Sequence, residues 1–111
     1  MNWLPLTDEL QLAQIKENSF TTPVVLFKHS TRCSVSNMVK NRLERDTQPE
    51  GVSFYYLDLL TYRPISNKIA EDYKVYHASP QVLVIKNGEC IYEESQMGIT
   101  MDEIAEQVAA G

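Results

Sequence analysis

The sequence predicts an α/β fold in which helices flank a central four-stranded mixed sheet, with a C-terminal β-hairpin and a last helix. Strand-like and helix-like segments alternate along the chain, which favours parallel strands. Asn87-Gly88 between two strand-like runs is typical of an antiparallel hairpin. The 111 residues have room for one core, so we expect residues 1–111 to form a single domain.

The first helix and the first strand follow from the residues before Cys33. Thr7 is predicted to cap a helix that ends near Asn18, since the apolar residues between them follow an imperfect helical spacing. Pro23 then opens a strand. Because Val24–Phe27 are all apolar, both faces of this strand should be covered, which predicts a central position in the sheet.

The middle of the chain predicts a helix, a strand and another helix. Apolar residues recur at three- and four-residue spacing from Cys33 to about Asp46, and Pro49-Glu50-Gly51 ends that helix. Val52–Asp58 is rich in strand-forming residues. Pro64 suits the first residue of a helix that runs to about Tyr73.

The last third predicts the hairpin and the final helix. Val82–Ile85 and Cys90–Tyr92 flank the Asn87-Gly88 turn and should pair antiparallel. Thr100 and Glu103 have the spacing of a capping box, which predicts a helix after Thr100.

Composition and charge exclude several classes of partner. With 43% apolar and 23% charged residues, the chain has an ordinary globular composition. The net charge of −5 and the lack of a basic patch argue against binding to nucleic acid or to anionic membranes. The N-terminal segment lacks the cationic start and apolar stretch of a signal peptide, and no apolar run is long enough to span a bilayer. We expect a cytoplasmic monomer.

Two cysteines, Cys33 and Cys90, suit a reducing compartment. A structural disulfide between them stays open at this point. The cysteines and the two histidines, His29 and His77, show no paired ligand spacing, so we expect no metal site. Cys90 falls inside a hairpin strand, where packing explains it more simply than a resolving role.

Cys33 stands where a strand gives way to a helix, the place where parallel α/β sheets put their ligands. A thiol at a helix N-terminus is expected to favour the thiolate. Arg32 adds a positive charge, and the hydroxyls of Ser34 and Ser36 could donate to the sulfur. The motif is Cys-x-x-Ser, so this site cannot close its own disulfide. The simpler alternative is that Cys33 is a small buried apolar residue.

Three separated segments resemble one family. Phe27–Ser36, Arg63–Ala70 and His77–Gln81, in this order, are similar to the monothiol bacilliredoxin family, the bacillithiol-system redox proteins of the YtxJ type. The resemblance covers nearly the whole chain and implies a thioredoxin-like fold. The family pattern usually has proline after the cysteine, where this chain has Ser34.

The resemblance implies that Cys33 removes bacillithiol from S-bacillithiolated client proteins through a mixed disulfide, making the chain a monothiol thiol-disulfide oxidoreductase. No tightly bound cofactor is expected, and bacillithiol or another small thiol is the co-substrate. The resemblance also implies a cis Pro80 beside Cys33, with Ser79 offering its backbone to a substrate strand. Taken alone, a proline directly before a strand more often has the ordinary trans bond, and the sequence does not decide between the trans and cis forms.

Several roles stay open at this level. Arg63 and the helix start that follows it could hold an anionic thiol, although an ordinary proline-started helix also explains them. His29 could stabilise a thiolate when protonated, and the function of His77 is no better defined. The small thiol could be glutathione, as in glutaredoxin-like proteins, and the fold could serve as a non-catalytic binding module.

Overall fold

The computed structural model describes residues 1–110 of the chain. The elements, in order, are β1 (Trp3–Pro5), α1 (Gln11–Asn18), β2 (Val24–His29), α2 (Ser34–Arg45), β3 (Ser53–Asp58), α3 (Arg63–Tyr73), β4 (Gln81–Lys86), β5 (Glu89–Ser95), the short 3₁₀ helix η1 (Gln96–Gly98) and α4 (Met101–Ala109). No helix within residues 1–110 has the length and apolar character needed to cross a bilayer.

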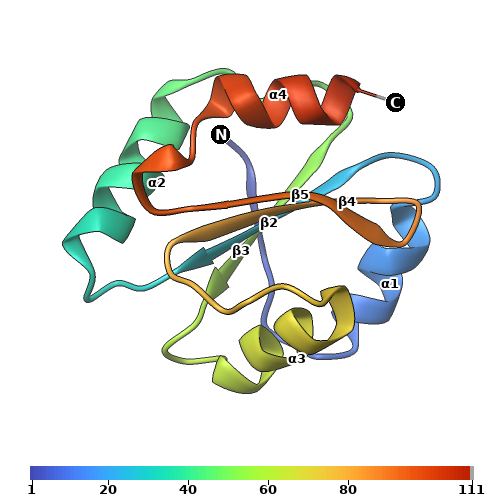
Figure 1. The fold of residues 1–111 in the computed structure, drawn as a ribbon, viewed down its shortest axis with the longest axis horizontal. Coiled ribbons are helices and arrows are strands. Elements are labelled where there is room, and N and C mark those ends of the chain that lie inside the picture. The colour runs from blue at the N-terminus through green and yellow to red at the C-terminus, as the bar shows by residue number, and fades with distance from the viewer. Residues whose placement is uncertain (111) are drawn as a thin grey trace.

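The strands form one mixed sheet in the order β1-β3-β2-β4-β5. β1 and β2 both run parallel to β3, whereas β4 runs antiparallel to β2 and to β5. In Figure 1, α2 and α4 lie on one side of this sheet, and α1 and α3 lie on the other. The predicted α/β fold with its C-terminal hairpin and last helix is confirmed, and the sheet contains one strand more than predicted.

Two apolar cores fill the layers, one on each face of the sheet. One core joins β2, β3 and β4 to the apolar residues of α2 and α4, and the other joins them to those of α1 and α3. All six residues of β2 are buried. The predicted central position of this strand is therefore confirmed, and its even and odd residues face opposite cores.

The hairpin turn has the predicted chemistry. Asn87 and Gly88 have φ values of 53° and 77°, the left-handed conformation that a tight two-residue hairpin turn requires. The cap predicted at Thr100 is also present. The Glu103 N–H donates to the Thr100 hydroxyl (3.2 Å), and α4 follows.

The N-terminal segment differs from the prediction in two ways. The first helix begins at Gln11 rather than after Thr7, because the Gln11 side-chain carbonyl accepts the N–H groups of Thr7 and Asp8 (2.8 and 2.9 Å) and closes a turn there. The sequence pattern also does not predict β1, because three residues are too few to show an alternation of apolar and polar side chains. Trp3 holds this strand in place.

Trp3 makes three kinds of contact with the rest of the fold. Its ring stacks on Phe27 (5.4 Å between centroids) and meets Phe54 edge-on (6.1 Å). Its indole N–H donates to Glu44 Oε2 of α2 (2.7 Å). The β1 strand is thus tied both to the sheet and to the helix that begins after Cys33.

We expect Trp3→Ala to lower the free energy of unfolding by about 3 kcal/mol, because it removes most of the packing of a half-buried aromatic ring. Trp3→Phe should cost only about 1 kcal/mol, because it loses the hydrogen bond to Glu44 and keeps an aromatic ring. Urea unfolding followed by circular dichroism measures both. Equal losses in the two variants would contradict the packing role of the ring.

Candidate functional site

Cys33 lies between β2 and α2, at the N-cap of the helix, with extended backbone (φ −102°, ψ 119°). Its N–H donates to the Ser30 carbonyl (3.2 Å), and its carbonyl accepts the Asn37 N–H (3.0 Å). The thiol is free and half-buried. An N-cap side chain stands next to the unpaired N–H groups of the first turn, although the Cys33 side chain makes no capping hydrogen bond.

The turn before Cys33 is held by α2 itself. The Asn37 side-chain amide donates to the Thr31 carbonyl (3.2 Å), and Ser30 is buried. Arg32 and Ser34, on either side of the cysteine, are exposed. The structure thus leaves both side chains at the surface, and their predicted effect on the thiolate stays a prediction.

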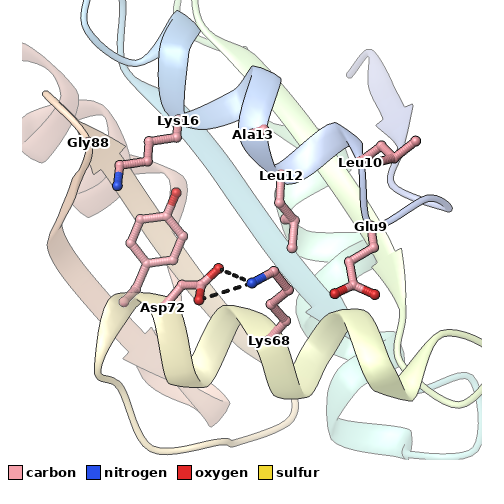
Figure 2. Close-up of a pocket in the computed structure, with 9 residues that line it drawn as sticks. Glu9, Leu10, Leu12, Ala13, Lys16, Lys68, Asp72 and Gly88 are labelled. Atoms are coloured by element: carbon pink, nitrogen blue, oxygen red, sulfur yellow. Dashed lines mark hydrogen bonds and ion pairs between the residues drawn. The ribbon is translucent and has the colours of Figure 1, made fainter.

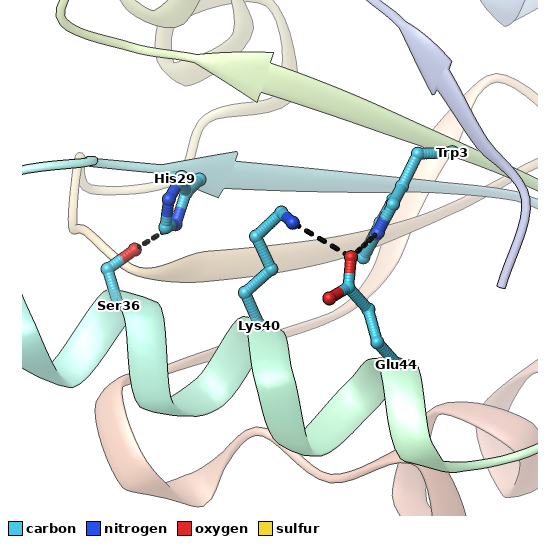
Figure 3. Close-up of polar contacts among 5 residues, drawn as sticks. All are labelled: Trp3, His29, Ser36, Lys40 and Glu44. Atoms are coloured by element: carbon cyan, nitrogen blue, oxygen red, sulfur yellow. Dashed lines mark hydrogen bonds and ion pairs between the residues drawn. The ribbon is translucent and has the colours of Figure 1, made fainter.

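Ser36 is fully buried, and its hydroxyl is used within the fold. Its Oγ lies 2.6 Å from Nδ1 of His29 and accepts the Ser30 N–H (3.1 Å). Figure 3 shows His29 of β2 and Ser36 of α2 pointing toward one another. Ser36 therefore links the end of the strand to the start of the helix, and its predicted donation to the Cys33 sulfur stays a prediction.

The environment of His29 keeps its imidazole neutral. Burial lowers the pKa of His29 below its usual 6.5, and the Lys40 ammonium lowers it further, whereas Asp58 and Glu44 act weakly in the other direction. The ring stacks on Phe27 (5.9 Å). At neutral pH His29 thus carries no charge that could stabilise a thiolate, and it acts as a partner for Ser36.

A second polar group lies farther along α2. Lys40 forms an ion pair with Glu44 (2.8 Å), which also accepts the Trp3 indole N–H (Figure 3). The hydrogen bond from Lys40 is the main cause that lowers the pKa of the Glu44 carboxyl. Lys40 also lies 5.5 Å from the centre of the Tyr56 ring. This network anchors the helix behind the cysteine.

Ser79 and Pro80 stand directly before β4, and the bond between them is cis, as the family resemblance implied. Because Lys28 pairs with Gln81, Pro80 lies at the end of β2 that leads to Cys33. Pro80 is buried, and the Ser79 hydroxyl is buried without a hydrogen-bond partner in the described chain. The carbonyl of Ser79 accepts a hydrogen bond from the side chain of Gln96 (2.8 Å).

Arg63 is the first residue of α3 and is exposed. The loop before it is tied to the cysteine turn, because the Leu59 N–H donates to the His29 carbonyl (3.0 Å). In Figure 1 the segments that follow β2 and β3 leave the sheet at the same edge. Arg63 thus starts a helix at the same end of the parallel strands as Cys33. Its predicted binding of an anionic substrate stays a prediction.

Lys28 is a buried cation that was not among the residues predicted to form the site. It is fully buried in β2, and its ammonium donates to the Ser66 carbonyl of α3 (3.1 Å). Burial lowers the pKa of Lys28 from 10.5 to about 8. The Ser66 hydroxyl in turn lies 3.1 Å from Nδ1 of His77, whose pKa is lowered by burial and by nearby Lys28 and Arg63.

The sequence does contain evidence for the burial of Lys28. Side chains two residues apart on a strand share a face, so Lys28 lies on the same buried face as Val24 and Leu26. The contact of Gln96 with Ser79 could not be predicted in this way, because Gln96 follows a strand and Ser79 lies 17 residues away in the sequence.

Cys90 lies elsewhere in the fold. It packs in the core that contains α1 and α3, and its thiol points to the Tyr92 carbonyl (3.2 Å). Burial raises the pKa of the Cys90 thiol. These contacts agree with a packing role.

A pocket of about 550 Å³ opens between α1 and α3. Figure 2 shows Leu12 and Lys16 of α1 facing the Lys68–Asp72 ion pair of α3 (3.1 Å) across it. It lies on the opposite side of the sheet from α2, so it does not belong to the Cys33 site.

The chain matches one family model over most of its length. The model is described as monothiol bacilliredoxin BrxC, and it matches residues 4–104.

Solved structures with similar folds agree with the observed architecture. One is a protein with a thioredoxin fold described as a candidate oxidoreductase, with a TM-score of 0.78, 29% identity, and 95% of this chain and 92% of that chain covered. Thioredoxin from Malassezia sympodialis has a TM-score of 0.74 at 22% identity, covering 99% and 92%. Spinach chloroplast thioredoxin f has a TM-score of 0.71 at 14% identity, covering 96% and 89%. The fold is thioredoxin-like.

We expect Ser36→Ala to lower the free energy of unfolding by about 1–3 kcal/mol, because it leaves the buried Ser30 N–H and His29 Nδ1 without a partner. Urea unfolding measures this loss. The exposed Ser34→Ala is the matched control and should change stability by less than about 0.5 kcal/mol.

Lys28→Met should be at least as stable as the wild type at pH 7, where the buried ammonium is charged in the folded and unfolded states and burial penalises it. Between pH 8 and about 10.5 the folded wild type has lost this proton and the unfolded chain still binds it, so wild-type stability rises with pH. The advantage of Lys28→Met should therefore shrink by up to roughly 3 kcal/mol across this range.

Urea unfolding at pH 7, 8.5 and 10 measures the effect, with the exposed Lys16→Met as control. If the free energies of unfolding of Lys28→Met and wild type change in parallel with pH, the pKa of Lys28 is not lowered in the folded protein.

Proposed function

The chain belongs to the monothiol bacilliredoxin family, and from that premise we propose that Cys33 removes bacillithiol from S-bacillithiolated protein cysteines. Family membership and the similarity to thioredoxin-fold proteins support a thiol redox function in general. We propose bacillithiol as the small thiol and modified proteins as its source.

The observation that carries the proposal is the position of Cys33. The thiol is free and half-buried at the N-cap of a twelve-residue helix that follows the central strand. Unpaired N–H groups and the positive end of the helix dipole favour negative charge at this position. A thiolate there is the attacking form in disulfide exchange.

The reaction balances with one cysteine. The Cys33 thiolate attacks the bacillithiol sulfur of the modified protein, a new S–S bond forms, and the protein cysteine leaves as a thiolate that takes a proton from water. A second bacillithiol, as thiolate, then attacks the bacillithiol sulfur held by Cys33 and releases the Cys33 thiolate. The products are the repaired protein thiol and oxidised bacillithiol.

The surroundings of Cys33 support release by an external thiol. Ser36, where a second cysteine would stand in a Cys-x-x-Cys site, is buried and bonded to His29. Cys90 packs in the core on the α1 and α3 side of the sheet. Neither residue therefore provides an internal thiol that could displace the carried group.

The substrate is expected to be held at three places around Cys33. Ser79 would pair with the client backbone as an added strand, and Pro80 would form the wall beside it. Arg63, exposed at the start of α3, would contact a carboxylate of the small thiol. These contacts are shallow, which suits many different clients.

We expect wild-type protein incubated with oxidised bacillithiol to gain the mass of one bacillithiol, and Cys33→Ser to gain none, because Cys33 is the only carrier in the mechanism. Mass spectrometry of the intact protein measures this, with oxidised glutathione as the competing substrate. Cys90→Ser is the matched control and should form the adduct at the wild-type rate.

The other outcomes separate the remaining possibilities. Faster adduct formation with glutathione would move the assignment to a glutaredoxin-like protein. Slow reaction of Cys33 with alkylating agents, together with no adduct from either disulfide, would favour a non-catalytic binding module. An adduct that persists in Cys33→Ser would overturn the mechanism.

A further inference from the structure

The Ser79 carbonyl, which an added substrate strand would use, already has a partner in the folded protein. The Gln96 side-chain amide donates to it (2.8 Å), and the Gln96 backbone N–H donates to the Pro80 carbonyl (3.1 Å). One residue therefore occupies both carbonyls of the Ser79–Pro80 segment.

The backbone N–H of Ser79 is in the opposite state. Within residues 1–110, no backbone carbonyl accepts a hydrogen bond from it. A residue in an antiparallel pair exchanges two bonds with its partner, one through N–H and one through C=O. Ser79 thus presents a polypeptide with an available N–H donor and with a carbonyl that already has a hydrogen-bond partner.

Gln96 is held in this position by the helix of the site. Its φ of 56° is uncommon for a residue other than glycine. Arg42 of α2 donates to the Met97 carbonyl (3.0 Å) and to the Ile99 carbonyl, on either side of Gly98. Because α2 begins directly after Cys33, the segment that carries Gln96 and the reactive cysteine are attached to one rigid element.

We propose that Gln96 determines substrate specificity by competing with the backbone of a polypeptide client for the Ser79 carbonyl, while small disulfides react without this competition. The inference rests on the proposed exchange at Cys33 and adds to it the residue that sets the ratio of polypeptide to small substrates. A small disulfide has no extended backbone to pair with Ser79, so it does not need the carbonyl.

The exposed position of the Gln96 side chain makes the competition reversible. Its amide can turn to water when a client N–H replaces it, and only one hydrogen bond is exchanged. A hydrogen bond of this kind changes an equilibrium by about two- to tenfold. The expected effect on polypeptide substrates is of that size.

The test compares wild type, Gln96→Ala and Gln96→Glu in reactions with two probes. One probe is an extended peptide whose cysteine forms a mixed disulfide with bacillithiol, and the other is oxidised bacillithiol. Gln96→Glu keeps the length of the side chain, but its carboxylate cannot donate to a carbonyl. Both variants should react about two- to tenfold faster with the peptide and at the wild-type rate with the small disulfide.

Gln14→Ala, an exposed glutamine on α1, is the matched control and should leave both rates unchanged. A second measurement tests peptide binding without disulfide exchange. In a Cys33→Ser background, the affinity for the unmodified, fluorescently labelled peptide is measured by anisotropy with and without the additional Gln96→Ala substitution. This substitution should raise the affinity by the same factor.

The outcomes separate this inference from the proposed function. If wild type reacts with both probes and the ratio of rates is the same in the Gln96 variants, the inference is overturned and the exchange at Cys33 stands. If wild type reacts with neither probe, the proposed function fails and the anisotropy decides. A higher affinity in Gln96→Ala then supports the competition for Ser79, and an unchanged affinity or no binding overturns it.

Discussion

The burial of β2 on both faces imposes a requirement on the helices that cover it. A strand covered by helices on each side can expose none of its side chains, and all six residues from Val24 to His29 are buried. The last two of these residues, Lys28 and His29, are polar, and they lie just before the turn that leads to Cys33. The chain therefore brings two ionisable groups into its interior close in sequence to Cys33, and the surrounding helices must supply their partners.

Each helix next to β2 meets this requirement in a different way. On one face, α2 offers the Ser36 hydroxyl to His29, and the imidazole stays neutral because burial lowers its pKa. On the other face, α3 offers the Ser66 carbonyl to Lys28, and burial lowers the pKa of this ammonium to about 8. The first arrangement fixes the start of α2, where Cys33 stands. The second carries a cost in stability at neutral pH that an apolar residue would not have.

The contact with His29 also gives Ser36 a structural role. The position three residues after Cys33 is committed to joining strand and helix through His29, so a buried hydroxyl fills the place of a second thiol. The Cys33 thiol at the N-cap remains half-buried. Around it, Arg42 and Gln96 connect α2 with the Ser79–Pro80 segment, so the groups proposed to attack the disulfide and to hold the client belong to one rigid unit.

Features that arise from neighbours along the chain could be predicted from the sequence. The apolar run of β2, the Asn87-Gly88 turn, the Thr100 cap and the place of Cys33 at a strand-helix junction all depend on residues a few positions apart, and the structure confirms them. Tertiary packing joins Lys28 to Ser66 and Ser79 to Gln96, which are 38 and 17 residues apart. It also decided the placement of β1, because a three-residue strand is stabilised by the contacts of Trp3 with Phe27 and Glu44 rather than by its own propensity. Such contacts depend on how the helices and the sheet pack together, and no local pattern of residues predicts this packing.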